Sequence, residues 1–122
     1  MQILNGIDTE KIERIEKSVQ NPRFLSRIFT EKECEMFERR GNNPSTITAN
    51  FCAKEAFLKA IGIGISYIPF TDIEVLRDEK GKPYYNFYGK ALEFIEQNCF
   101  TSSLSITHTK ELATAFVILY KE

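Results

Sequence analysis

The sequence predicts an α+β fold, with helices concentrated early in the chain and antiparallel strands late. In the first half, apolar residues recur at helical spacing, most strongly over residues 46–61. In the second half, apolar and polar residues alternate in short segments joined by turns, which is typical of hairpins. The chain has 122 residues, a usual length for one domain, so we expect a single domain over residues 1–122.

The chain is expected to begin with a strand followed by helices. Residues 2–8 form a short, largely apolar segment that favours a strand. Thr9 can cap a helix over residues 10–20, and the Asn-Pro pair at 21–22 ends that helix. A further helical turn is expected over residues 24–29, where large apolar side chains cluster.

Two longer helices should follow. Thr30 and Glu33 have the spacing of a capping box and open a helix that stops at Gly41. After a loop at 41–45, the helix at 46–61 is apolar around most of its circumference. That pattern is typical of a central, buried helix.

The rest of the chain is expected to hold two hairpins separated by a helix. The turn of the first hairpin lies at 78–81 and that of the second at 109–111. The expected elements are strands at 72–77 and 83–88, a helix at 90–98, and strands at 103–108 and 112–120.

Composition excludes several classes of function. Lys and Arg total 16 against 17 Asp and Glu, which argues against a general nucleic-acid binder. No apolar run approaches the roughly 20 residues of a membrane span, and we expect no signal peptide and no membrane partner. The three cysteines lack a Cys-x-x-Cys spacing and only one histidine is present, so a zinc site is not expected. Reduced cysteines in the cytoplasm are the simplest interpretation.

The helix at 46–61 carries three charged residues among apolar neighbours: Lys54, Glu55 and Lys59. Glu55 and Lys59 lie one turn apart, so one interpretation is an ordinary ion pair on a solvated stripe. The other is a carboxylate that binds a cation, because an unpaired carboxylate in apolar surroundings is costly. Gly62 and Gly64 follow the helix and either allow close approach of a ligand or simply cap the helix.

Two further residues have both a structural and a functional interpretation. Asp8 follows an apolar strand and is either a helix cap or a magnesium ligand, with Glu55 as the second carboxylate. His108, the only histidine, lies at a strand end among hydroxyls. It is either a hydrogen-bonded structural residue or a contact for a phosphate or another substrate group.

The first helix has a regular charge pattern, because basic residues recur every three positions and acidic residues lie one position earlier. One interpretation is a solvated face with internal ion pairs. The other is a basic stripe that docks an acidic protein. The stripe consists of Lys11, Arg14 and Lys17, extended by Arg23 and Arg27.

Several motifs in this order resemble the holo-acyl-carrier-protein synthases, the short, trimeric type of 4′-phosphopantetheinyl transferase. The resemblance spans residue 3 to about residue 118. Its main motifs are Gly6-Ile7-Asp8, Arg27-Ile28-Phe29-Thr30-x-x-Glu33, Phe51-x-Ala53-Lys54-Glu55-Ala56-x-x-Lys59-Ala60-x-Gly62-x-Gly64 and Ser105-Ile106-Thr107-His108-Thr109.

The resemblance implies an antiparallel sheet packed against a long central helix, and a specific reaction. The family transfers the phosphopantetheine arm of coenzyme A to a serine of apo acyl carrier protein and releases adenosine 3′,5′-bisphosphate. This reaction supports fatty acid biosynthesis in the cytoplasm. The family forms homotrimers whose active sites lie between subunits.

The resemblance also implies roles for individual residues. Asp8 and Glu55 match the magnesium ligands, and Lys59 would steady charge on the transferred phosphate. The serine proton would pass to a metal-bound water or to Glu55. Coenzyme A would contact Lys54, Lys59, Gly62, Gly64, His108 and Thr109, and the basic stripe would dock the acidic carrier protein.

The sequence departs from the family pattern near the expected coenzyme A site. Asn50 stands where the family usually has Arg, and the loop at 41–46 is neutral instead of basic. Ile63 removes a hydroxyl from the usual Gly-Thr-Gly. Weaker coenzyme A binding is expected. Two other functions stay open: a non-catalytic binding module, and a phosphotransferase or hydrolase acting on another pyrophosphate.

Overall fold

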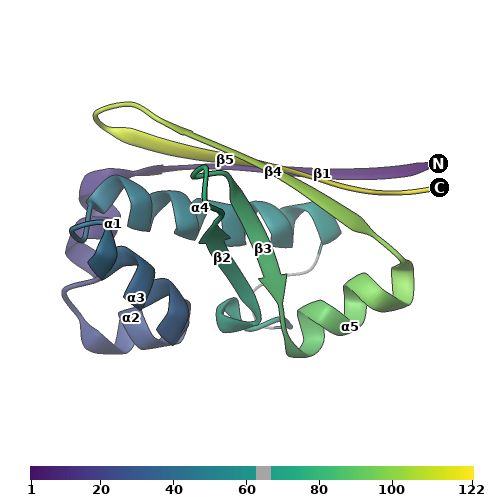
Figure 1. Cartoon of the computed structure of the whole chain (residues 1–122), viewed down its shortest axis with the longest axis horizontal. Coiled ribbons are helices and arrows are strands. Elements are labelled where there is room, and N and C mark those ends of the chain that lie inside the picture. The colour runs from purple at the N-terminus through teal and green to yellow at the C-terminus, as the bar shows by residue number, and fades with distance from the viewer. Residues whose placement is uncertain (63–66) are drawn as a thin grey trace.

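A sheet and one long helix form the two main layers of the computed structural model, which describes residues 1–62 and 67–122 (Figure 1). The sheet contains β1 (Gln2–Lys11), β5 (Leu112–Lys121) and β4 (Thr101–His108), in the order β1-β5-β4. All of its pairings are antiparallel. Helix α4 (Pro44–Ile61) packs along one face of this sheet and confirms the predicted central helix.

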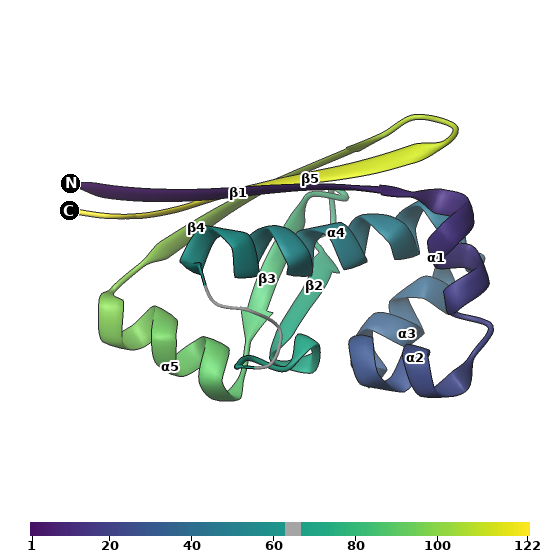
Figure 2. The same cartoon turned by 180° about the vertical axis from the view of Figure 1, so that it is seen from behind.

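The remaining elements gather below α4 in two groups (Figures 1 and 2). One group lies near the beginning of α4 and consists of α1 (Ile12–Ser18), α2 (Pro22–Ile28) and α3 (Glu31–Arg39). The other consists of the hairpin β2 (Ile73–Arg77) and β3 (Pro83–Phe87), a short 3-10 turn η1 (Phe70–Asp72), and α5 (Gly89–Asn98). The α+β prediction is therefore confirmed, with both hairpins close to their expected positions.

Helix α4 is the centre of the core. Most of its residues are buried, including Phe57, Ala53 and Cys52, which explains why its sequence is apolar on nearly every side. Its C-terminal end is capped by Gly62 in the left-handed conformation, at φ 74°. Among the described helices, none is both long and apolar enough to cross a membrane.

Strand β1 crosses α4 at Gly6 with almost no space between the two backbones. A Cβ at Gly6 would lie 1.9 Å from the carbonyl oxygen of Ala56 and 2.8 Å from the amide nitrogen of Ala60. Only glycine can occupy such a position without moving the strand or the helix. This crossing holds the residues that follow Gly6 against α4.

The structure corrects two predicted boundaries in the first part of the chain. Strand β1 continues to Lys11, because it pairs with β5 over its whole length, so α1 begins only at Ile12. Thr9 therefore does not cap a helix; its hydroxyl bonds that of Thr114 on the neighbouring strand. Pro22 begins α2, with the Asn21 side chain as its cap. The capping box of Thr30 and Glu33 is confirmed.

Candidate functional site

Asp8 lies within β1 on the strand face that α4 covers, and only 7% of it is exposed. Its Oδ1 accepts a hydrogen bond of 3.0 Å from the Lys59 ammonium. Its Oδ2 is buried without a hydrogen-bond partner in the described part of the chain. Burial is the main reason why the pKa of Asp8 rises from 3.8 to about 6, although Lys59 opposes the change. The interpretation of Asp8 as a helix cap is wrong, because Lys11 occupies the cap of α1.

Lys59 reaches from α4 to β1 and joins the two elements at the site. Besides Asp8, its ammonium donates to the carbonyl oxygen of Ile7 at 3.1 Å. The expected ion pair with Glu55 is replaced in the described structure by the pair with Asp8. The side chain remains 55% exposed, so the ammonium can still meet a ligand from solvent.

Glu55 lies one helical turn before Lys59 and is half-buried. No hydrogen-bond partner for its carboxylate is present among the described residues. Burial and the charge of Glu10 raise its pKa, while Lys59 and Arg14 act in the opposite direction. Glu55 therefore shares two charged neighbours, Glu10 and Lys59, with Asp8.

Glu10 is a member of this cluster that the sequence analysis missed. Its charge raises the pKa of both Asp8 and Glu55. The charge pattern predicts Glu10 in the acidic row of the first helix, but β1 extends far enough to include it. The signal was the two-residue alternation of Gly6, Asp8 and Glu10, which places all three on one strand face.

Lys54 is fully buried, which contradicts the expectation that it reaches coenzyme A. Its ammonium donates to Glu33 Oε1 at 2.7 Å, to the carbonyl oxygen of Phe70 at 3.0 Å and to that of Ile73 at 2.7 Å. Burial lowers the pKa of Lys54 and raises that of Glu33, while each partner's charge opposes the shift. The role of Lys54 is to join α4, α3 and β2 in the core.

Asn50 belongs to the same buried network. Its side-chain amide donates to Glu33 Oε2 at 2.8 Å and to the carbonyl oxygen of Val75 at 2.9 Å. No part of Asn50 is exposed, so it faces the core instead of a bound ligand. The structure therefore gives no support to a direct contact between position 50 and coenzyme A.

The other residues expected to contact coenzyme A lie at opposite ends of α4. Gly62 is at its C-terminal end. The tip of the β4–β5 hairpin, with His108 and Thr109, lies beside the start of α1 at the other end (Figure 2). His108 is exposed, and its Nδ1 lies 3.2 Å from the Thr109 carbonyl oxygen. Gly64 lies outside the described residues.

The basic stripe is exposed on α1, α2 and the end of β1, as a docking surface requires. Two of its members already have acidic partners four residues earlier: Arg14 pairs with Glu10 near the end of β1, and Lys17 pairs with Glu13 on α1 at 3.0 Å. The ion-paired helix face predicted as the alternative is thus also present.

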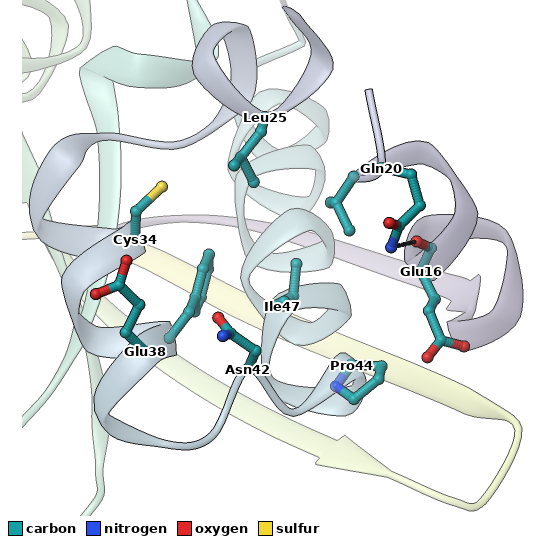
Figure 3. A pocket seen from close by; sticks show the side chains of 10 residues that line it. Glu16, Gln20, Leu25, Cys34, Glu38, Asn42, Pro44 and Ile47 are labelled. Atoms are coloured by element: carbon teal, nitrogen blue, oxygen red, sulfur yellow. Dashed lines mark hydrogen bonds between the residues drawn. The ribbon is translucent and has the colours of Figure 1, made fainter. Parts of the chain in front are cut away.

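A cavity of about 350 Å³ lies between α1, α2, α3 and the start of α4 (Figure 3). Leu25, Cys34 and Ile47 point toward it, and Glu16 and Glu38 lie at its sides. None of the predicted catalytic or coenzyme A residues lines this cavity. The candidate site is instead the cluster that Asp8 on β1 forms with Lys59 and Glu55 on α4.

Comparisons with known proteins agree with this fold. The family model of the 4′-phosphopantetheinyl transferase superfamily matches residues 5–117. A holo-acyl-carrier-protein synthase of Clostridium botulinum is 44% identical over 115 residues, which are 93% of this chain and 94% of that protein.

Solved structures lead to the same family. A holo-acyl-carrier-protein synthase of Bacillus anthracis, in complex with CoA (3′,5′-ADP), is 36% identical with a TM-score of 0.77, over 95% of this chain and 94% of that chain. The Helicobacter pylori holo-acyl-carrier-protein synthase in complex with coenzyme A is 30% identical, with a TM-score of 0.83. The match covers 96% of this chain and 100% of that chain. The chain therefore belongs to the 4′-phosphopantetheinyl transferase superfamily.

Proposed function

We infer that this chain is a holo-acyl-carrier-protein synthase, which transfers the 4′-phosphopantetheine of coenzyme A to a serine of apo acyl carrier protein. Family membership and the coenzyme A complexes of its relatives support the substrate. The observation on this chain that carries the proposal is the buried, unpartnered Oδ2 of Asp8, whose Oδ1 is bonded to Lys59. Glu55 shares the charged neighbours Lys59 and Glu10 with Asp8. A carboxylate oxygen that is buried without a partner is costly unless it has a ligand to bind.

The residues fit a magnesium ion at this position. Asp8 offers a buried carboxylate oxygen without a hydrogen-bond partner in the described structure, and Glu55 offers a second, half-buried carboxylate. Mg²⁺ is commonly held by one or two carboxylates, with waters and substrate phosphates as its other ligands. Bound there, the ion would offset the charge of the pyrophosphate and polarise its oxygens.

The surrounding side chains have roles that follow from their charges. Lys59 keeps Asp8 in place through Oδ1 and offers its exposed ammonium to the transferred phosphate. Glu55 is our candidate for the acceptor of the serine proton, since its raised pKa favours proton uptake. Gly62 at the end of α4 leaves room for the nucleotide, as the family pattern implies.

The separation of the expected coenzyme A contacts supports an active site shared between subunits. An 18-residue helix such as α4 is about 27 Å long, so Gly62 and the tip that holds His108 and Thr109 cannot meet on one small ligand within one subunit. A neighbouring subunit can supply the hairpin tip. We therefore propose the trimer, with His108 and Thr109 of one subunit facing the carboxylates of the next.

The outer face of the sheet is the surface that fits such an assembly. Ile3 pairs across the ladder with Tyr120, and Ile7 with Phe116, on the face opposite α4. Their exposed fractions are 56%, 39%, 56% and 38%. Contiguous exposed apolar side chains of this kind mark interaction surfaces.

Light scattering is expected to give three times the mass of the chain at micromolar concentration. Phe116→Glu should yield monomers, because it places a charge in the apolar interface, and should lose transferase activity with the trimer. Tyr84→Glu is the matched control, since Tyr84 is 45% exposed but lies on the separate hairpin. A monomeric native chain, or a Phe116→Glu variant that remains trimeric, would contradict this interface.

The basic stripe is proposed as the docking surface for the carrier protein, in agreement with its exposure and charge. We also propose a cytoplasmic location. The cysteines Cys34, Cys52 and Cys99 are all free thiols, as expected in a reducing compartment.

The function is tested by mass spectrometry of apo acyl carrier protein incubated with this chain, coenzyme A and magnesium. We expect the carrier protein to gain the mass of one phosphopantetheine, with equimolar release of adenosine 3′,5′-bisphosphate. Omission of magnesium should stop the reaction. Release of the bisphosphate without carrier protein would indicate a hydrolase instead, and coenzyme A binding without turnover would indicate a non-catalytic module.

A further inference from the structure

The cavity between α1, α2, α3 and the start of α4 has no role in the proposed function (Figure 3). Its volume of about 350 Å³ lies within the usual range for small-molecule sites. Much of its lining is apolar, because Phe37 and Ile47 are buried and Leu25 is half-buried. An apolar lining of this kind favours a ligand with an aliphatic or aromatic part over water.

The walls of the cavity are held by hydrogen bonds at the helix ends around it. Helix α1 ends at Val19, whose amide donates to the Ile15 carbonyl oxygen at 3.0 Å. Between α3 and α4, the amide of Asn42 donates to the Phe37 carbonyl oxygen at 2.8 Å, and Pro44 begins α4. Walls whose backbone is already fixed need little ordering when a ligand binds, so the cavity is largely preformed.

Two acidic side chains lie on opposite sides of the cavity, Glu16 on α1 and Glu38 on α3 (Figure 3). Among the described residues that line the cavity, none is basic. Neither carboxylate has a salt bridge within residues 1–62 and 67–122. Burial is the main reason why the pKa of the Cys34 thiol rises, and the charges of Glu33 and Glu38 add to the effect. The negative charge of Glu38 therefore acts on a side chain that points toward the cavity.

We propose that this cavity binds a linear aliphatic diamine, with one ammonium beside Glu16, the other beside Glu38, and the methylene chain over the apolar lining. A monoamine would meet only one of the two carboxylates, and a neutral or anionic molecule would leave both without a counter-charge. Gln20 lies on the Glu16 side, where its side-chain nitrogen donates to the Glu16 carbonyl oxygen at 3.2 Å. Its amide oxygen takes no part in that bond and can accept a hydrogen bond from an ammonium.

The inference goes beyond the proposed function and does not depend on it. The cavity is lined neither by the cluster of Asp8, Lys59 and Glu55 nor by any member of the basic stripe. A diamine bound here therefore leaves the candidate site open.

Isothermal titration calorimetry of the full chain tests the proposal with the diamines from 1,4-diaminobutane to 1,8-diaminooctane. We expect one diamine per chain, with an optimum of length at which both ends reach a carboxylate. The best diamine should bind at least about threefold more tightly than the monoamine of the same length, as one further ion pair on an exposed carboxylate implies. The corresponding diol should bind more weakly than the monoamine. If no diamine binds at up to about 10 mM, or if none binds better than its monoamine, the proposal is overturned.

Glu16→Gln and Glu38→Gln each remove one charge and keep the size of the side chain. Each variant should bind the best diamine no more tightly than the native chain binds the monoamine. Glu13 on α1 and Glu35 on α3 provide matched controls, since both are exposed and neither lines the cavity. Glu13→Gln and Glu35→Gln should keep the diamine affinity within about twofold of the native value. Equal losses in all four variants would show a general attraction to acidic surface and would overturn the proposal.

Two further measurements show whether the diamine lies inside the cavity. Leu25→Phe fills part of the space without changing a charge, so it should weaken diamine binding severalfold. In the native chain, saturating diamine should slow the alkylation of Cys34 by N-ethylmaleimide severalfold and leave that of the exposed Cys99 unchanged. The alkylation result decides the matter even if Leu25→Phe does not fold. Unchanged alkylation of Cys34, or a folded Leu25→Phe variant with native affinity, would contradict a ligand in this cavity.

Discussion

Asp8→Asn is expected to slow phosphopantetheine transfer by about a hundredfold or more, as measured by the mass shift of the carrier protein. The amide cannot supply the negative oxygen that a cation requires at this position, and losses of this size are typical for one electrostatic group of a site. Glu55→Gln should give a comparable loss. Glu13→Gln is the control and should retain the native rate, because Glu13 is exposed on α1 and pairs with Lys17 instead of a member of the cluster.

Asp8→Asn should not destabilise the fold. Burial raises the pKa of Asp8 from 3.8 to about 6, so between these values the folded chain holds a proton that the unfolded chain has lost. The contribution of Asp8 to stability therefore falls as the pH rises from about 4 to about 6. In Asp8→Asn this dependence disappears, and its melting temperature should equal or exceed the native value at pH 7. Full activity, or an unfolded variant, would contradict this assignment.

Lys54→Met is expected to lower the free energy of unfolding by about 3–5 kcal/mol, measured by urea denaturation at one fixed protein concentration. The substitution leaves the carboxylate of Glu33 buried without its cation, although Asn50 and the Val75 amide still donate to it. Loss of the ammonium also removes the donors to the carbonyl oxygens of Phe70 and Ile73.

Two control variants show whether the loss of stability in Lys54→Met comes from the broken pair with Glu33. Lys32→Met changes an exposed lysine on α3, next to Glu33, and should alter stability by less than about 0.5 kcal/mol. Glu33→Met in the Lys54→Met background removes the orphaned charge and should recover part of the loss. If Lys54→Met is as stable as the native chain, the buried pair does not hold α3, α4 and β2 together.

The arrangement of elements could be predicted largely because its signals are local. The apolar helix at 46–61, the capping box of Thr30 and the two hairpins each depend on neighbours within a few residues. The boundary between β1 and α1 could not be predicted, because the strand is extended by pairing with β5, which lies at the other end of the sequence.

The members of the candidate site could be predicted only in part. Asp8, Glu55 and Lys59 could be selected because each is a charged residue within or beside an apolar segment. Their geometry was not, because the contact of Lys59 with Asp8 joins residues 51 positions apart. Lys54 was misassigned for a similar reason: the partner that explains its burial, Glu33, lies on another helix, and no local pattern shows that they meet.

The pairing of β1 with β5 also has a consequence for how the protein acquires its activity. Gln2 lies opposite Lys121, so the strand that carries Asp8 finds its neighbour only when the last residues of the chain are available. Contacts that span nearly the whole sequence form slowly. A nascent chain on the ribosome can therefore build α4 early, but the sheet that carries Asp8 is completed only after β5 has been synthesised and has left the ribosome.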